Sequence, residues 1–326
     1  MGPHGYACTT MEGTTCLFLV INSSNDKIET ISKGKATMEL ILGKCEEVME
    51  TIPDKSIDLI LTSPPYWAKR IYESQEKVEN PIGAEPTPIE YVNRMADLFT
   101  KMSRVLKDEG NLFVNIGDTY FGSGAGASSK YATDDTLKRR RMEKYLPTHA
   151  LQPKIKNDHK LYQPKQLLMI PARFAIAMQE RGWILREDII WQKTNPVPSG
   201  VRDRCNTTYE HIFHFVKQRK YYFNIEGIKV MGKNGKRKNV GDIWSIPTQA
   251  LQGTEHTASF PEELVRRIIT SACPEGGRVF EPFLGTGTTC LVAEQENRES
   301  IGCEISEEYM QYAKDRIERY KKKKGV

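Results

Sequence analysis

The sequence lacks the features of a secreted or membrane protein. Its seven cysteines are scattered, no two of them are separated by two residues, and their number is odd, which predicts free thiols rather than disulfides. No apolar run approaches the ~20 residues of a membrane span. The short apolar stretch at residues 16–21 follows the acidic Glu12, whereas a signal peptide has a basic region before its apolar segment. We therefore expect a cytoplasmic protein.

The usual motifs for metals and phosphates are also missing. The six histidines show no metal-ligand spacing and there is no Cys-x-x-Cys pair, so we expect no metal site. The chain has no P-loop lysine, and its Gly-x-Gly at residues 285–287 lacks a third glycine in dinucleotide spacing. These absences disfavour a bound pyrophosphate.

Charge is present but unevenly distributed. The 326 residues suit one large α/β domain with an inserted or appended subdomain. Residues 138–160 hold eight Lys or Arg against two acids, and residues 193–240 hold eleven against three. Together these two segments carry a charge of +14. Because the net charge of the whole chain is +5, the rest of the chain sums to −9. The pattern predicts a surface for a polyanion such as nucleic acid; two solvated loops are the alternative.

From residue 36 onward, short apolar strands alternate with amphipathic helices, which is typical of an α/β fold. Strands are predicted over residues 38–42, 57–62, 111–116, 183–191, 209–217, 278–281 and 300–304. Helices are predicted over residues 45–51, 88–106, 165–181, 261–273, 288–296 and 306–324, with a loop or hairpin over 227–239.

A glycine-rich turn begins at Glu281 and contains Gly285 and Gly287. It lies between a predicted strand and a predicted helix, and its glycines allow a ligand to approach the backbone closely. Glu304 ends the next predicted strand, 23 residues after Glu281, where a carboxylate can accept hydrogen bonds from ribose hydroxyls. A nucleoside without a pyrophosphate, such as S-adenosylmethionine, fits this pattern. A structural turn with a surface glutamate is the alternative.

A second turn, Ser63-Pro64-Pro65-Tyr66, follows the apolar strand at residues 57–62. Proline cannot continue a central strand, so the chain leaves the sheet at the strand end where α/β proteins bind ligands. The Ser63 hydroxyl and a proline carbonyl can accept hydrogen bonds from an exocyclic amine, and Tyr66 offers a face on which a flipped-out base can stack. Because such an amine is a poor nucleophile, catalysis would act through positioning and electrostatics. A rigid proline turn with packed aromatics is the alternative.

Together, the segments SPPYW and EPFLGTGTT resemble the amino-methyltransferases of DNA, whose catalytic motif is (S/N/D)-P-P-(Y/F). The catalytic motif comes first, the cofactor motif last, and the basic region between them, as in the β group of that family. The resemblance covers about residues 36–320. It implies an α/β, Rossmann-like S-adenosylmethionine-dependent methyltransferase fold with a mixed, mostly parallel sheet, a circularly permuted motif order and an inserted target-recognition region.

Composition and the same resemblance together divide the chain into four predicted parts. Residues 1–32 are an N-terminal arm, disordered or forming an accessory strand. Residues 33–198 are the catalytic part and include a basic loop at 119–164. Residues 199–251 are the target-recognition region, and residues 252–326 complete the catalytic domain with the cofactor-binding part.

The resemblance and the charge pattern also assign roles to individual residues. Catalytic roles fall on Ser63, Pro64, Pro65 and Tyr66. Cofactor-binding roles fall on Asp118, Thr257, Phe260, Pro261, Glu281, Phe283, Gly285, Gly287, Thr288 and Glu304. Contacts with DNA fall on Lys138, Arg139, Arg140, Arg141, Arg202, Arg204, Lys233, Lys236, Arg237 and Lys238, with ordinary surface charge as the alternative. Family members often have Asp where this chain has Glu281, whose carboxylate lies one methylene further out.

A serine before Pro-Pro is typical, by resemblance, of N4-cytosine enzymes, whereas Asp or Asn is typical of N6-adenine enzymes. The resemblance therefore implies methyl transfer from S-adenosylmethionine, leaving S-adenosylhomocysteine, to N4 of a flipped-out cytosine in double-stranded DNA at a prokaryotic nucleoid. The alternatives are an N6-adenine enzyme, an RNA base methyltransferase and a nucleic-acid-binding relative without turnover. A cognate restriction endonuclease is the expected partner if the enzyme belongs to a restriction–modification pair; both a monomer and a homodimer are compatible with the sequence.

Overall fold

The computed structural model describes residues 18–21, 26–32, 37–68, 81–121, 161–196, 200–232, 234–249 and 260–324. Most of the predicted basic loop at residues 119–164 lies outside these ranges. So do the predicted DNA contacts Lys138, Arg139, Arg140, Arg141 and Lys233 and the predicted cofactor contact Thr257.

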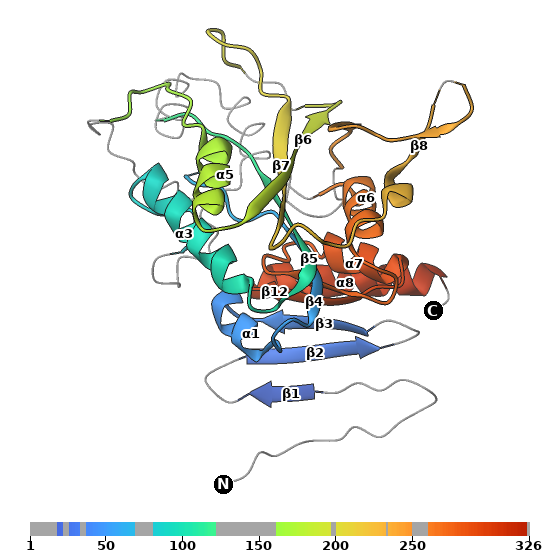
Figure 1. Cartoon of the computed structure of the whole chain (residues 1–326). Coiled ribbons are helices and arrows are strands. Elements are labelled where there is room, and N and C mark those ends of the chain that lie inside the picture. The colour runs from blue at the N-terminus through green and yellow to red at the C-terminus, as the bar shows by residue number, and fades with distance from the viewer. Residues whose placement is uncertain are drawn as a thin grey trace, which may run out of the picture.

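One ten-stranded sheet forms the centre of the described chain, in the order β1-β2-β3-β12-β11-β4-β5-β7-β6-β10. The strands from β3 to β5 in that order run parallel, β7 is antiparallel to both of its neighbours, and β10 is parallel to β6. Antiparallel β1 and β2 extend the edge that is lowest in Figure 1. The predicted α/β class with a mixed, mostly parallel sheet is confirmed. The strands of this sheet are β1 (Phe18–Ile21), β2 (Asp26–Ser32), β3 (Thr37–Leu42), β4 (Ile57–Thr62), β5 (Leu106–Ile116), β6 (Ile184–Lys193), β7 (Tyr209–Val216), β10 (Ile243–Ile246), β11 (Arg278–Glu281) and β12 (Glu299–Glu304).

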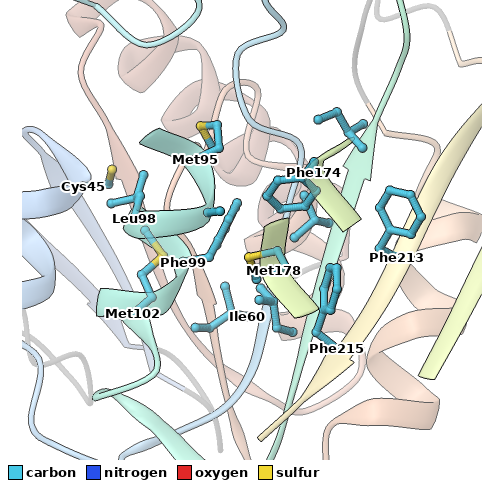
Figure 2. Packing of buried hydrophobic residues seen from close by; sticks show 14 of the residues in the cluster. Cys45, Ile60, Met95, Leu98, Phe99, Met102, Phe174, Met178, Phe213 and Phe215 are labelled. Atoms are coloured by element: carbon cyan, nitrogen blue, oxygen red, sulfur yellow. The ribbon is translucent and has the colours of Figure 1, made fainter. Parts of the chain in front are cut away.

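Helices cover both faces of the sheet. Helices α1, α3 and α5 pack on one face, and α6, α7 and α8 pack on the other. Strand β4 is buried on both sides, with Ile60 toward α3 and α5 and with Leu59 and Leu61 toward α6, which explains the run of apolar residues at 59–61. Figure 2 shows the first face, where the rings of Phe99 and Phe174 meet edge to face at 5.7 Å. The helices are α1 (Cys45–Thr51), α3 (Pro88–Met102), α5 (Ile170–Glu180), α6 (Glu262–Ala272), α7 (Thr288–Gln295), α8 (Glu307–Lys324) and the short 3₁₀ helix η1 (Ile225–Ile228).

The predicted elements agree with the structure except at a few ends. Helix α3 ends at Met102 rather than at Leu106, because Leu106 already begins β5 and pairs with Ile57 of β4. Helix α5 begins at Ile170 rather than at residue 165, because Met169 has a left-handed φ of 56° that no α-helix accommodates. Strands β1, β2 and β10 were not identified as elements, although an accessory strand near the N-terminus was allowed for. The predicted loop or hairpin over 227–239 begins within η1 and contains the two-stranded hairpin of β8 (Val230–Met231) and β9 (Arg237–Lys238).

The parallel strands bring distant segments to one edge of the sheet. Strands β11 and β12, from the C-terminal part of the chain, lie between β3 and β4. The register pairs Phe280 with Ile60, so Glu281, the last residue of β11, and Ser63, the first residue after β4, lie at the same edge of the sheet. The circular permutation of motifs remains a prediction. No helix within the described ranges is long and apolar enough to cross a membrane.

Candidate active site

The proline turn after β4 is held in place by α3 and the segment before it. The buried Tyr91 of α3 donates a hydrogen bond from its hydroxyl to the Pro65 carbonyl (2.8 Å). Trp67 is also buried, and its indole N–H donates to the Glu85 carbonyl (2.9 Å). The prolines offer no N–H of their own, so the turn is held through a carbonyl and a packed aromatic ring. Trp67 is thus a core residue.

Polar side chains from β5 and β7 meet the proline turn at the hydroxyl of Tyr66, and a lysine of β6 supports one of them. This hydroxyl lies 2.8 Å from Oε2 of Glu210, 3.2 Å from Oδ1 of Asn115 and 3.4 Å from Oγ of Ser63. Lys193 donates a hydrogen bond to Oε1 of Glu210, the second carboxylate oxygen. Burial, together with the charge of Glu210, raises the pKa of Tyr66 well above its usual value. The phenol therefore keeps its proton at neutral pH, and of these three contacts the one with Glu210 is the shortest.

The sequence patterns did not single out Asn115, Lys193 or Glu210 as functional residues. Only their positions at strand ends could have indicated a functional role. Asn115 and Lys193 lie near the carboxyl ends of β5 and β6, and Glu210 lies near the start of antiparallel β7. All three therefore reach the edge at which the proline turn leaves the sheet. Gly117 makes room for the ring of Tyr66, because a Cβ at Gly117 would lie only 2.8 Å from Cε2 of that ring.

Glu281 lies inside the glycine-rich turn. Its carboxylate accepts hydrogen bonds from the Phe283 backbone N–H (3.1 Å) and from the Thr289 hydroxyl (2.8 Å). The side chain is almost completely buried, and burial raises the pKa of Glu281 from its ordinary value to about 8. Glu281 thus fixes the start of the turn, and its longer side chain still reaches Thr289 of α7.

Glu304 joins the turn to the following helix. Its carboxylate accepts hydrogen bonds from the backbone N–H groups of Gly285 (2.8 Å) and Ser306 (2.9 Å). Burial raises the pKa of Glu304. Each carboxylate oxygen has two lone pairs, so these two contacts leave acceptor capacity for a ligand hydroxyl at this strand end.

The glycines of the turn are required by its backbone. Gly285 and Gly287 have positive φ values of 52° and 77°, a region that favours glycine. A Cβ at Gly287 would lie 2.9 Å from Cβ of Ala313 in α8. Next to this glycine, Thr288 accepts a hydrogen bond from the buried guanidinium of Arg316 (2.7 Å). The turn is therefore packed tightly against α8.

Three further residues predicted to bind the cofactor make contacts within the protein. Asp118 Oδ1 accepts hydrogen bonds from the backbone N–H groups of Thr119 (2.8 Å) and Ile170 (3.0 Å), so Asp118 caps α5. Phe260 packs in the cluster under α6, and Pro261 directly precedes that helix. Cofactor contacts of Asp118, Phe260 and Pro261 remain predictions.

Comparison with known proteins decides the family. The model of the DNA methylase family, which covers N6 and N4 methyltransferases, matches residues 57–315. The chain belongs to this family of S-adenosylmethionine-dependent DNA amino-methyltransferases.

Curated relatives and a solved structure agree with this assignment. The methyltransferase is 37% identical over 291 residues to the type II methyltransferase M.SmaI of Serratia marcescens, which covers 89% of this chain and 94% of that protein. It is 36% identical over 279 residues to M.Cfr9I of Citrobacter freundii, with 86% and 87% covered. Its fold is similar to that of the PvuII DNA methyltransferase (cytosine-N4-specific), with a TM-score of 0.61, 21% identity and 86% of each chain covered.

The predicted DNA contacts that the structure describes lie in two places on this methyltransferase. Arg202 and Arg204 lie between β6 and β7, on the same edge as the proline turn, and the guanidinium of Arg204 stacks 3.9 Å from the ring centroid of Tyr120. The others lie on the β8–β9 hairpin. Lys236 and Lys238 are exposed there. Arg237 donates to the Glu226 carbonyl (2.7 Å) and so braces the hairpin at its base. Within the described ranges, no group of three or more potential metal ligands occurs.

Proposed function

We propose that this methyltransferase acts on N4 of a cytosine flipped out of double-stranded DNA. The observation that carries the base assignment is the side chain before Pro-Pro: Ser63 places a neutral hydroxyl, rather than a carboxylate or an amide, at the edge where the sheet ends. The similar fold of the PvuII enzyme, which is cytosine-N4-specific, supports the same base.

The residues at the ends of β11 and β12 fit S-adenosylmethionine. The positive-φ glycines of the turn allow a ligand close to the backbone, and Glu304 keeps acceptor capacity for ribose hydroxyls. We assign Glu304, Gly285, Gly287, Phe283, Thr288, Glu281, Phe260, Pro261, Thr257 and Asp118 to this site. When bound, S-adenosylmethionine supplies a methyl group on a sulfonium: the new N–C bond forms as the C–S bond breaks, and the amine must release one proton.

The proline turn would hold the base. In this proposal, the Ser63 hydroxyl and the Pro64 carbonyl accept hydrogen bonds from the two amine hydrogens, which directs the nitrogen lone pair toward the methyl group. The bracing of the turn through Pro65 and Trp67 keeps these acceptors in place before the substrate arrives. Catalysis of this kind depends on positioning and electrostatics rather than on a covalent intermediate.

The cationic residues would bind the DNA backbone. Arg202, Lys236 and Lys238 are exposed. Arg204 is held by Tyr120 at the edge where the proline turn leaves the sheet, which we call the catalytic edge in this proposal. We assign these residues, with Arg237, Lys233 and the segment 138–141, to phosphate or guanine contacts. Because phosphate contacts release counterions, we expect DNA affinity to fall steeply with salt concentration.

The decisive experiment is methylation of a mixed-sequence duplex with labelled S-adenosylmethionine, followed by mass spectrometry of the nucleosides. N4-methylcytosine as the product, lost in Ser63→Ala by about 10²–10³-fold, is the expected result, since removal of one well-placed polar group costs that much. N6-methyladenine would overturn the base assignment and leave the family in place. Product on single-stranded RNA alone would overturn double-stranded DNA as the substrate. Methylation of a plasmid that protects it from a restriction endonuclease of the same specificity would identify a cognate partner.

A further inference from the structure

The chain of hydroxyls at the catalytic edge ends on a carboxylate. Tyr66 Oη lies 3.4 Å from Ser63 Oγ and 2.8 Å from Glu210 Oε2, so the three groups form a chain of hydrogen bonds. The first contact is long for two hydroxyls and the second has the ordinary length. Lys193 holds the far oxygen of Glu210, which is only 13% exposed. The Glu210 carboxylate, which pairs with Lys193 and accepts a hydrogen bond from the Tyr66 phenol, can therefore accept a proton at the end of this chain.

The direction of the hydrogen bonds in this chain decides whether Ser63 acts as a donor or as an acceptor toward the substrate. A serine hydroxyl is both donor and acceptor, and only the acceptor role orients an amine for attack. The phenol of Tyr66 has a single proton, and Glu210 at 2.8 Å lies nearer to it than Asn115 at 3.2 Å. The raised pKa of Tyr66 keeps that proton on the ring oxygen. With its proton directed to Glu210, the Tyr66 oxygen is left to accept from Ser63, and the lone pairs of Ser63 are then available to a substrate amine.

We propose that Glu210 is a positioning residue that makes Ser63 an acceptor through Tyr66 and that receives the proton released by the amine. This inference rests on the proposed role of Ser63 toward an exocyclic amine. The proton leaves the amine nitrogen for Ser63, the Ser63 proton moves to Tyr66, and the Tyr66 proton moves to Glu210. The net transfer is one proton, which turns the Glu210 carboxylate into a neutral carboxylic acid beside the Lys193 ammonium. Glu210 returns the proton to solvent after the product leaves.

Two variants of the full-length enzyme separate this role from a structural one. Glu210→Gln keeps an oxygen that can accept from Tyr66 but cannot take a proton, and Tyr66→Phe keeps the ring but interrupts the chain. We expect each to lower kcat by about 10²-fold or more, as for loss of a general base, with KM for duplex DNA and Kd for S-adenosylmethionine changed by less than about threefold. Because the residues act as one unit, the double variant should be no slower than Tyr66→Phe alone.

Glu109→Gln is the matched control. Glu109 also forms a Glu–Lys pair, with Lys220 at 3.0 Å, but it lies near the start of β5, at the opposite edge of the sheet. Its kcat should equal that of the wild type. Thermal unfolding and S-adenosylmethionine binding verify that each variant is folded.

The outcomes separate the two proposals. Glu210→Gln within about threefold of the wild-type kcat, or a double variant as slow as the product of the two single effects, would overturn the role of Glu210 while wild-type N4-methylcytosine still supports the proposed function. A wild type that makes N6-methyladenine overturns the base assignment alone, and the ratio of the variants still tests Glu210. A wild type with no product on any amine would overturn both proposals.

Discussion

The two turns of the candidate active site differ in how they are held. In the glycine-rich turn, the acids bind residues close in the chain: Glu281 binds Phe283 two residues on, and Glu304 binds Gly285 19 residues back. In the proline turn, Tyr66 binds Asn115 and Glu210, which are 49 and 144 residues away. The first turn is a local unit on adjacent strands, whereas the second becomes a site only when the sheet assembles.

The difference shows where each kind of chemistry is encoded. A cofactor turn needs glycines and acids at fixed spacing, so its residues lie within one strand–helix–strand unit. A reactive hydroxyl needs polar partners in a low-dielectric surrounding, and these partners come from whichever strands end beside it. The following four predictions, from the largest expected effect to the smallest, test this contrast.

Glu281→Gln should change the pH dependence of stability. The pKa of Glu281 is raised to about 8, so between roughly pH 5 and 8 the folded chain keeps a proton that the unfolded chain releases. The free energy of unfolding of the wild type therefore falls as pH rises through that window, by at most about 5 kcal/mol, and the glutamine variant lacks this loss. Urea unfolding at pH 6 and pH 9 should show the variant gaining stability relative to the wild type at the higher pH.

The exposed Glu275 provides the control, since Glu275→Gln should follow the wild type at both pH values. A Glu281→Gln difference that stays constant with pH would mean that the buried carboxylate is ionised in the folded chain.

Gly117→Ala should damage catalysis more than folding. Its Cβ would press on the ring of Tyr66 at 2.8 Å, and displacement of a positioning group by about 1 Å can cost roughly 10²-fold in rate. Steady-state kinetics on duplex DNA should show the fall in kcat. Gly200→Ala, where no atom lies within 4 Å of the new Cβ, serves as the control. Full activity of Gly117→Ala would show that kcat does not depend on the exact position of the Tyr66 ring.

Gly287→Ala should destabilise the glycine-rich turn. The new Cβ would lie 2.9 Å from that of Ala313, on a backbone with φ of 77°, and such crowding with strain costs about 1–3 kcal/mol. Gly276→Ala has a similar φ of 72° but open space around it, so it isolates the strain from the crowding. Equal losses of unfolding free energy in the two variants would remove packing against α8 as the cause.

Tyr91→Phe should have the smallest effect. It removes the hydrogen bond to the Pro65 carbonyl and leaves that acceptor without this donor, a loss of about 1–2 kcal/mol in unfolding free energy. Tyr221→Phe removes an exposed contact with Arg186 and should stay within about 0.5 kcal/mol. If chemical denaturation finds the two variants equal, the brace on the proline turn is weaker than its geometry suggests.

Much of the fold could be predicted because its strands are apolar and its helices amphipathic. Strand β4 and helix α1 were predicted with the observed ends. The ends of α3 and α5 were wrong because pairing of Leu106 with β4 and the left-handed Met169 override helical periodicity. β10 escaped notice because four residues with two exposed positions give little periodic signal.

The candidate site was predicted in part for the same reason. Ser63, Tyr66, Glu281 and Glu304 were all recognisable, since each lies directly at a turn or a strand end. Glu210 resembled any polar residue at the start of a half-buried strand. Its contact with Tyr66 depends on β7 pairing antiparallel with β5, a pairing that local periodicity does not determine.

The sequence by itself determined the class of fold, the two turns and the family chemistry, because strand periodicity, proline and glycine act over a few residues. Tertiary structure alone decided the rest. It placed β11 and β12 between β3 and β4, brought Ser63 beside the glycine-rich turn, and joined Tyr66 to Glu210 and Lys193. These contacts depend on which strands become neighbours, and that choice follows from burial of the whole sheet between two layers of helices rather than from any single segment.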